Sequence, residues 1–102
     1  MKQAKWNIGQ VIHHKLFCYR GVIYDVDYEF MQSEQWYEKV ARSRPPKDEP
    51  WYRVLVDGKE QETYVAQRNL ESDSMEDPVN HPLLKHYFSG YKDGRYTMGH
   101  TN

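Results

Sequence analysis

The 102-residue chain has little of several features that would define its class. It has one cysteine, Cys18, which excludes an intrachain disulfide and is typical of a reducing compartment. No apolar run approaches the roughly 18 residues of a membrane-spanning helix. The first residues, Met-Lys-Gln-Ala-Lys-Trp, lack the apolar core of a signal peptide. We therefore expect a cytoplasmic protein with no membrane partner.

The chain also lacks a surplus of charge of either sign. Its 14 Lys and Arg residues face 15 Asp and Glu residues, so the net charge is −1 at pH 7. Strong nonspecific nucleic-acid binding usually requires a basic surplus. A DNA-binding surface in this chain would therefore need its basic residues gathered on one face.

The sequence patterns of common enzymes and metal sites are missing as well. The six glycines are scattered, so there is no phosphate-binding loop, and no serine stands in a nucleophile elbow. Cys18 lies near His13 and His14, but a small apolar residue in a turn is the simpler interpretation of this cysteine. The two histidines are neighbours, so on a strand they would point to opposite faces and could not easily share one metal ion. We predict no catalytic residues, no metal ligands and no cofactor.

Aromatic residues, by contrast, are abundant. They make up 15% of the chain, with nine tyrosines and three tryptophans, while the mean hydropathy is −1.01. Large rings with polar tips supply much buried area per residue and tolerate a wet edge. The length suits one compact domain and not two. We therefore expect one folded domain with an aromatic core.

Four stretches predict β-strands, over residues 8–14, 22–28, 51–56 and 62–66, and Leu70 follows a tight turn that would close a barrel. The second stretch alternates most clearly. Its inward face is predicted to hold Val22, Tyr24 and Val26. Its outward face is predicted to hold Ile23, Asp25 and Asp27.

Two further stretches predict helices. Ser33 is a suitable N-cap for a helix to about Ala41, which the Pro45-Pro46 pair cannot continue. Apolar residues at 83, 84, 87 and 88 follow a proline and predict a C-terminal helix that ends before Gly90. The fold class is thus mainly β: a small, five-stranded SH3-like barrel with a short inserted helix and a C-terminal helix. We place the domain at residues 1–90 and expect a partly disordered tail at 91–102.

Basic residues interleave with aromatic residues in three patches, and this pattern suits binding to bases and phosphates. The patches hold Lys2 and Lys5, then His13, His14, Lys15 and Arg20, and then Lys39, Arg42, Arg44 and Lys47. An aromatic core under a solvated charged surface explains the same residues more simply. An aromatic cage for a methylated side chain is a further alternative, although no spacing singles it out.

Several blocks in series resemble the YccV-like, or HspQ, family: "GQVIHHKLFCYRGVIYDVD", "EQWY", "RPPKDEPWYRVLV", "YVAQRNL" and "NHP". The resemblance covers about residues 5 to 83, in the same order and with matching spacing. Cys18 stands where the family block commonly has proline, which argues against an essential thiol. The segment from His81 to Gly99 is more similar to the version carried by eukaryotic F-box-only proteins than to the shorter bacterial heat-shock form.

The resemblance implies an SH3-like barrel without enzymatic activity and two classes of partner. The first is duplex DNA, with recognition of its hemimethylated form. The residues expected to contact it are His14, Lys15, Arg20, Arg42, Arg44 and Lys47. The second is a Lon-type protease and its substrates, with the chain as a quality-control adaptor. The residues expected to dock there are Trp51, Tyr87 and Phe88. Both classes are compatible with an oligomer.

Overall fold

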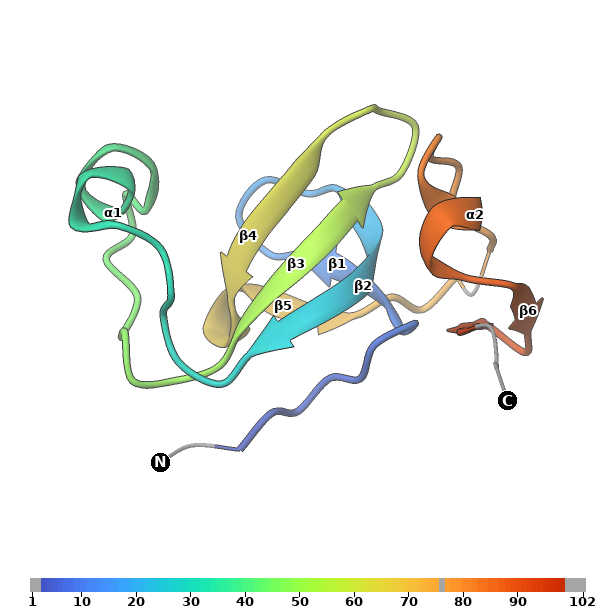
Figure 1. The fold of residues 1–102 in the computed structure, drawn as a ribbon, viewed down its shortest axis with the longest axis horizontal. Coiled ribbons are helices and arrows are strands. Elements are labelled where there is room, and N and C mark those ends of the chain that lie inside the picture. The colour runs from blue at the N-terminus through green and yellow to red at the C-terminus, as the bar shows by residue number, and fades with distance from the viewer. Residues whose placement is uncertain (1–2, 76, 99–102) are drawn as a thin grey trace.

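The centre of the molecule is a five-stranded antiparallel sheet in the order β4–β3–β2–β1–β5, seen in a computed structural model that describes residues 3–75 and 77–98 (Figure 1). Its strands are β1 (Val11–His14), β2 (Arg20–Asp27), β3 (Trp51–Val56), β4 (Glu62–Ala66) and β5 (Leu70–Ser72). A separate two-stranded sheet pairs β6 (Gly90–Lys92) with β7 (Arg95–Thr97). The predicted mainly β fold is confirmed, and the third and fourth strands have the predicted bounds.

The five-stranded sheet is open. Its two end strands, β4 and β5, are joined in sequence by the short 3-10 turn η1 (Gln67–Asn69), but no strand pairing links them among the described residues. The unpaired edge of β4 therefore stays available. Closure into an SH3-like barrel remains a prediction.

Strand β2 departs from the strict alternation that the sequence predicts. Its pairing with β3 shifts register between Ile23 and Asp25, and such a bulge moves the following side chains to the other face. Val22 and Tyr24 accordingly pack in one apolar cluster, while Ile23 and Val26 pack in another. The prediction that Ile23 faces solvent was wrong, because both faces of the sheet are covered and this side chain is fully buried.

One face of the sheet is covered by the C-terminal segment. The short helix α2 (Leu84–Tyr87) confirms the predicted C-terminal helix, and the β6–β7 hairpin follows it (Figure 1). Phe88 and Tyr96 are buried against Val11, Val22 and Leu55. The structure thus differs from the expected tail: residues 90–97 form a hairpin that packs on the core, since Tyr96 supplies an apolar anchor. Residues 99–102 of the expected tail lie outside the described residues.

Gly9 allows this hairpin to approach the start of β1. Its φ is 91°, in the left-handed region, and a Cβ atom there would lie 2.0 Å from the carbonyl oxygen of Tyr96. The backbone amide of Tyr96 donates to the Gly9 carbonyl at 2.8 Å. Only a residue without a side chain can make this contact.

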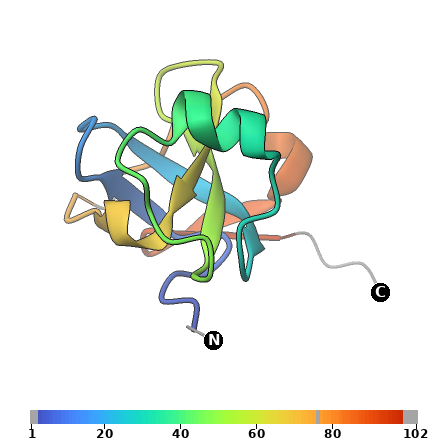
Figure 2. The same ribbon diagram turned by 90° about the vertical axis from the view of Figure 1, so that its left-hand side faces the viewer.

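The inserted helix α1 (Glu34–Val40) packs over one end of β3 and β4 (Figure 2). It lies on the same face of β3 as the C-terminal segment, because Trp51 beneath α1 and Leu55 beneath that segment are four residues apart in the strand. The hydroxyl of Ser33 accepts from the backbone amide of Trp36 at 3.1 Å, so the predicted N-cap is confirmed. Tyr37 and Ala41 are buried, and they pack against Trp51. Within the part of the chain that is described, the helices are all too short to cross a bilayer.

Candidate functional site

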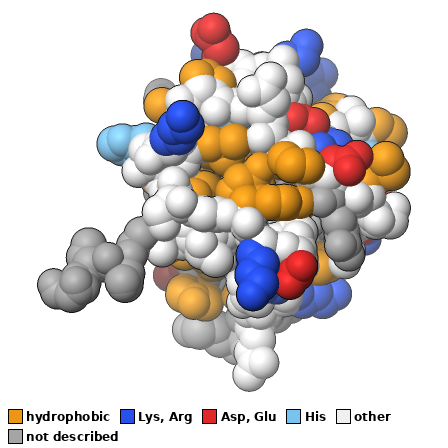
Figure 3. All heavy atoms as spheres, turned by 90° about the vertical axis from the view of Figure 1, so that its right-hand side faces the viewer, with side chains coloured by type: hydrophobic (Ala, Val, Ile, Leu, Met, Phe, Trp, Pro, Cys, Tyr) orange, Lys and Arg blue, Asp and Glu red, His pale blue; other side chains and the backbone are white. Residues whose placement is uncertain are grey.

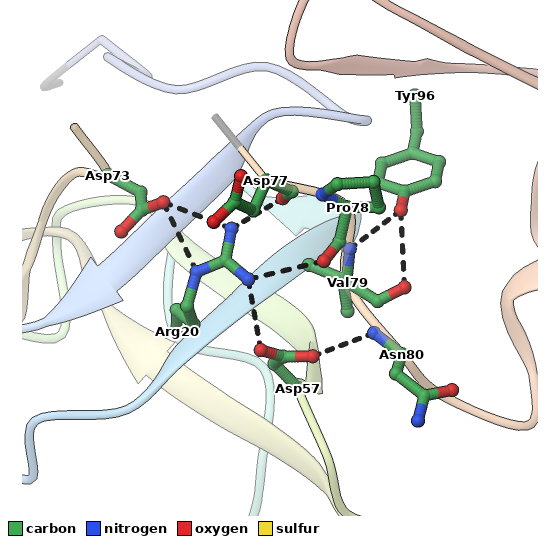
Figure 4. A network of polar contacts seen from close by, with 8 residues as sticks. All are labelled: Arg20, Asp57, Asp73, Asp77, Pro78, Val79, Asn80 and Tyr96. Atoms are coloured by element: carbon green, nitrogen blue, oxygen red, sulfur yellow. Dashed lines mark hydrogen bonds and ion pairs between the residues drawn. The ribbon is translucent and has the colours of Figure 1, made fainter. Parts of the chain in front are cut away.

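Arg20, expected to contact phosphate, lies at the centre of an internal polar network (Figure 4). Its Nε and Nη2 groups donate to the carboxylate of Asp73 at 3.2 and 3.1 Å, and Nη1 donates to Asp57 at 2.9 Å. The backbone carbonyls of Asp77 and Pro78 accept the remaining bonds at 2.5 and 3.3 Å. A guanidinium has five N–H donors, and these five bonds use all of them.

The network holds together segments that are distant in the sequence. Asp57 follows β3 and also accepts from the amide of Asn80 at 2.7 Å. Burial disfavours the charge of Arg20, but the hydrogen bonds and attraction of Asp73 and Asp57 outweigh it and raise the pKa of this guanidinium. Arg20 therefore organises the fold, and a phosphate would have to displace internal acceptors to reach it.

His14 also has a structural environment. Its ring is 4% exposed, and Nδ1 accepts from the amides of Leu16 and Phe17, both at 3.1 Å. Burial, and secondarily the charge of His13, lower its pKa. An unprotonated Nδ1 that accepts two bonds fixes the neutral form with the proton on Nε2. This histidine shapes the turn between β1 and β2 and brings no positive charge to a phosphate.

Two of the residues expected to dock on a protein are core residues. Trp51 is 1% exposed and donates from Nε1 to the Pro46 carbonyl at 3.1 Å, and Phe88 is 6% exposed. Tyr87 is half-buried, with its ring 4.5 Å from that of Tyr24. The aromatic residues are therefore abundant mainly because they form the core.

The aromatic cluster beneath α1 already faces cations of the chain itself. Lys47 lies 4.3 Å from the ring centre of Tyr37, and Arg53 lies 4.8 Å from that of Tyr64. These contacts occupy ring faces that a cage for a methylated side chain would use.

Three of the expected DNA contacts, Lys15, Arg42 and Arg44, lie on or beside loops that hydrogen bonds bring together. The amide of Lys15 donates to the Asn69 carbonyl at 2.8 Å, and the Asn69 side chain donates to the Ser43 hydroxyl at 3.3 Å. These bonds join the β1–β2 turn, η1 and the loop after α1. We define the Asn69 junction as the four exposed cations next to these bonds, Lys15, Arg42, Arg44 and Arg68.

The charges of the junction are only partly compensated. Arg44 pairs with Glu38 at 3.0 Å, and Arg68 lies 3.8 Å from Glu49. Lys15 and Arg42 have no ion pair within residues 3–75 and 77–98. The Arg44–Glu38 pair is exposed on both sides, and such pairs contribute only about 0–1 kcal/mol, so Arg44 can exchange to phosphate at little cost. Glu49 is buried, so Arg68 is held more firmly.

Lys47 stands apart from the junction, since it pairs with Glu34 and covers Tyr37. The sequence patches did not include Arg68. Arg68 could have been suggested by its place in the "YVAQRNL" block, directly before Asn69. Its proximity to Lys15, however, arises only in the fold.

A groove of about 810 Å³ opens beside the junction, along the unpaired edge of β4. All five residues of β4 line it. One wall is the end of α1 with Trp36 and Val40, and the other is the β1–β2 turn with Leu16 and Phe17. We call this feature the β4 groove.

A second, smaller hollow of about 510 Å³ lies on the far side of the molecule. Hydrophobic side chains gather on the face formed by α2 and the β6–β7 hairpin (Figure 3). The apolar side chains that line the hollow include Leu84, Phe88, Tyr91 and Tyr96.

The chain belongs to the YccV-like family. The family model, described as "Hemimethylated DNA-binding protein YccV like", matches residues 4–95 and so includes the β6 strand and the start of β7. The resemblance inferred from the sequence blocks is thereby confirmed. The family is of a DNA-binding type and is not a known family of enzymes.

Proposed function

We propose that this YccV-like domain binds duplex DNA, and prefers its hemimethylated form, through the Asn69 junction. The observation that carries the proposal is that hydrogen bonds through Asn69 join three loops that bear four exposed cations, in a chain whose net charge is −1. Segregated cations allow a near-neutral protein to meet a phosphate backbone.

The contact residues differ in part from those that the sequence suggested. Lys15, Arg42 and Arg44 remain, and Arg68 joins them. His14 and Arg20 act indirectly, because the first shapes the turn that carries Lys15 and the second fixes the fold. Lys47 stands apart from this surface, because it pairs with Glu34.

Fluorescence anisotropy with three duplexes of one sequence tests the proposal: unmethylated, hemimethylated and fully methylated. Arg42→Glu with Arg44→Glu should weaken binding at least tenfold at low salt and flatten the dependence of log K on log salt by about two charges. Lys59→Glu is the matched control, since this exposed lysine lies in the turn between β3 and β4. Equal affinity for the three duplexes would remove the methylation preference, and an unchanged affinity of the double variant would remove the site.

A role as an adaptor for a Lon-type protease is the second candidate. It is supported by Leu16 and Phe17, which are 54% and 70% exposed and so present apolar surface to a partner. In this case a purified Lon protease should degrade a model substrate faster in the presence of the chain, and Phe17→Ser should reduce the stimulation. Unchanged substrate turnover would exclude this function.

A further inference from the structure

We propose that the β4 groove binds an extended peptide segment as an additional strand on the edge of β4, with apolar side chains at consecutive positions and an acidic residue at the end near Arg42. The edge and walls of the groove are separate from the proposed DNA-binding surface, and the two share only Arg42, which lies at one end of the groove.

The backbone of β4 can accept a strand on its outer side. The amide of Val56 donates to the Gln61 carbonyl at 3.1 Å, and the amide of Gln67 donates to the Pro50 carbonyl at 3.0 Å. Hydrogen-bonded and non-bonded pairs alternate along an antiparallel ladder, so Glu62 and Tyr64 direct their amides and carbonyls away from β3. In residues 3–75 and 77–98, no hydrogen bond reaches these outer groups.

Both walls of the groove suit apolar side chains. A strand paired with β4 would direct alternate side chains to opposite faces. One set would meet Val40, which is 53% exposed, and Trp36 on α1. The other would meet Leu16 and Phe17. A segment with apolar residues on both faces therefore fits, whereas a strand with one polar face would leave one wall uncovered.

The two ends of the groove differ in charge. Arg42 and Ser43 line the end where η1 closes the groove, and Arg42 has no ion pair in the part of the chain that is described. At the other end Glu62 accepts from the hydroxyl of Tyr24 at 2.7 Å. An acidic residue is attracted to the first end and repelled from the second, which orients the peptide.

Because the edge of β4 is recessed, it can pair with a single extended segment but not with a second folded copy of this chain. The β1–β2 turn is tied to β4 by the 2.7 Å hydrogen bond between the hydroxyls of Tyr19 and Thr63, and α1 projects on the other side. These walls would meet the matching walls of a second copy before the two β4 edges came within pairing distance. A free extended segment has no such walls.

The test uses two fluorescein-labelled peptides of about eight residues. Each alternates valine with phenylalanine; one carries an aspartate at its N-terminus and a lysine at its C-terminus, and the other has the reverse order. At least one should bind, and N-methylation of its alternate backbone amides should abolish binding. Lack of binding by both peptides, or equal binding of the N-methylated form, would overturn the proposal.

Variants and amide exchange locate the complex. Phe17→Ser and Val40→Ser should each weaken peptide binding about tenfold, while Met75→Ser, a change at a 63% exposed residue outside the groove, should leave it unchanged.

The amide of Tyr64 should become protected from hydrogen exchange on binding, and that of Val65, already paired with β3, should not. Protection confined to other strands, or equal binding by all three variants, would contradict strand addition. Phe17→Ser should leave DNA binding intact, so this proposal and the proposed function fail separately.

Discussion

Two regions of this molecule use arginine in opposite ways. At the Arg20 network, all five donors of one guanidinium are bound by acceptors of the chain itself. At the Asn69 junction, Arg42 is exposed and unpaired within the described residues, and Arg44 holds a surface ion pair. The comparison teaches that a basic residue in a family motif indicates function only after its acceptors are known.

The two arginines should differ most in their contribution to the free energy of unfolding. Arg20→Ala leaves Asp73, whose side chain is 6% exposed, without its cation, and an uncompensated carboxylate of this kind costs about 3 kcal/mol of unfolding free energy. Arg42→Ala should cost under about 0.5 kcal/mol, as is usual for surface changes. Urea denaturation of both variants measures the comparison. Arg20→Lys keeps the charge but has fewer donors, so its unfolding free energy should lie between those of Arg20→Ala and Arg42→Ala. Equal stability of all three variants would contradict the structural role of Arg20.

The stability of the region around the Arg20 network also depends on the β6–β7 hairpin. The hydroxyl of Tyr96 accepts from the amide of Val79 at 2.8 Å and donates to its carbonyl at 3.2 Å. Tyr96→Phe leaves both groups buried without this partner and should cost about 1–2 kcal/mol. Tyr28→Phe, at a residue that is 61% exposed, is the control and should cost less. A thermal melt that is the same for both variants would contradict the packing of the hairpin described above.

A smaller effect on the free energy of unfolding is expected from pH, through His14 in the turn that carries Lys15. Since the pKa of His14 is lowered from its usual value of 6.5, the folded state favours the neutral ring. Its contribution to stability is complete above about pH 6.5 and is lost as the pH falls through the lowered value. The gap in unfolding free energy between the wild type and His14→Gln should therefore shrink on acidification from pH 7 to pH 5. A gap that grows over this range would contradict the assignment of His14.

Local sequence rules predicted much of the fold. Ser33 as an N-cap, the Pro45-Pro46 stop and the bounds of β3 and β4 depend on near neighbours, so they could be predicted from the sequence. The burial of Ile23 could not, because it follows from a bulge whose position depends on pairing with β3. The hairpin at residues 90–97 was missed for a similar reason, since its anchor, Tyr96, is set by contacts with Gly9 and Val79.

The candidate site was less predictable than the fold. Charge and aromatic content suggested residues, but only the fold separates Arg20, which is internally bound, from Arg42, which is exposed. The junction of Lys15 with Arg68 joins segments more than fifty residues apart through Asn69, and no local pattern signals such a meeting. The β4 groove likewise exists only because the sheet stays open.

The most direct test of the contrast between the two regions is a titration of the ¹⁵N-labelled domain with a hemimethylated duplex, monitored by amide chemical shifts. We predict that the largest shifts cluster at Lys15, at residues 42–44 and at 68–69, while the amides of Arg20 and Asp57 move little. Shifts centred on the Arg20 network, or on the face of α2 and the β6–β7 hairpin, would contradict the assignment of the Asn69 junction as the DNA-binding surface.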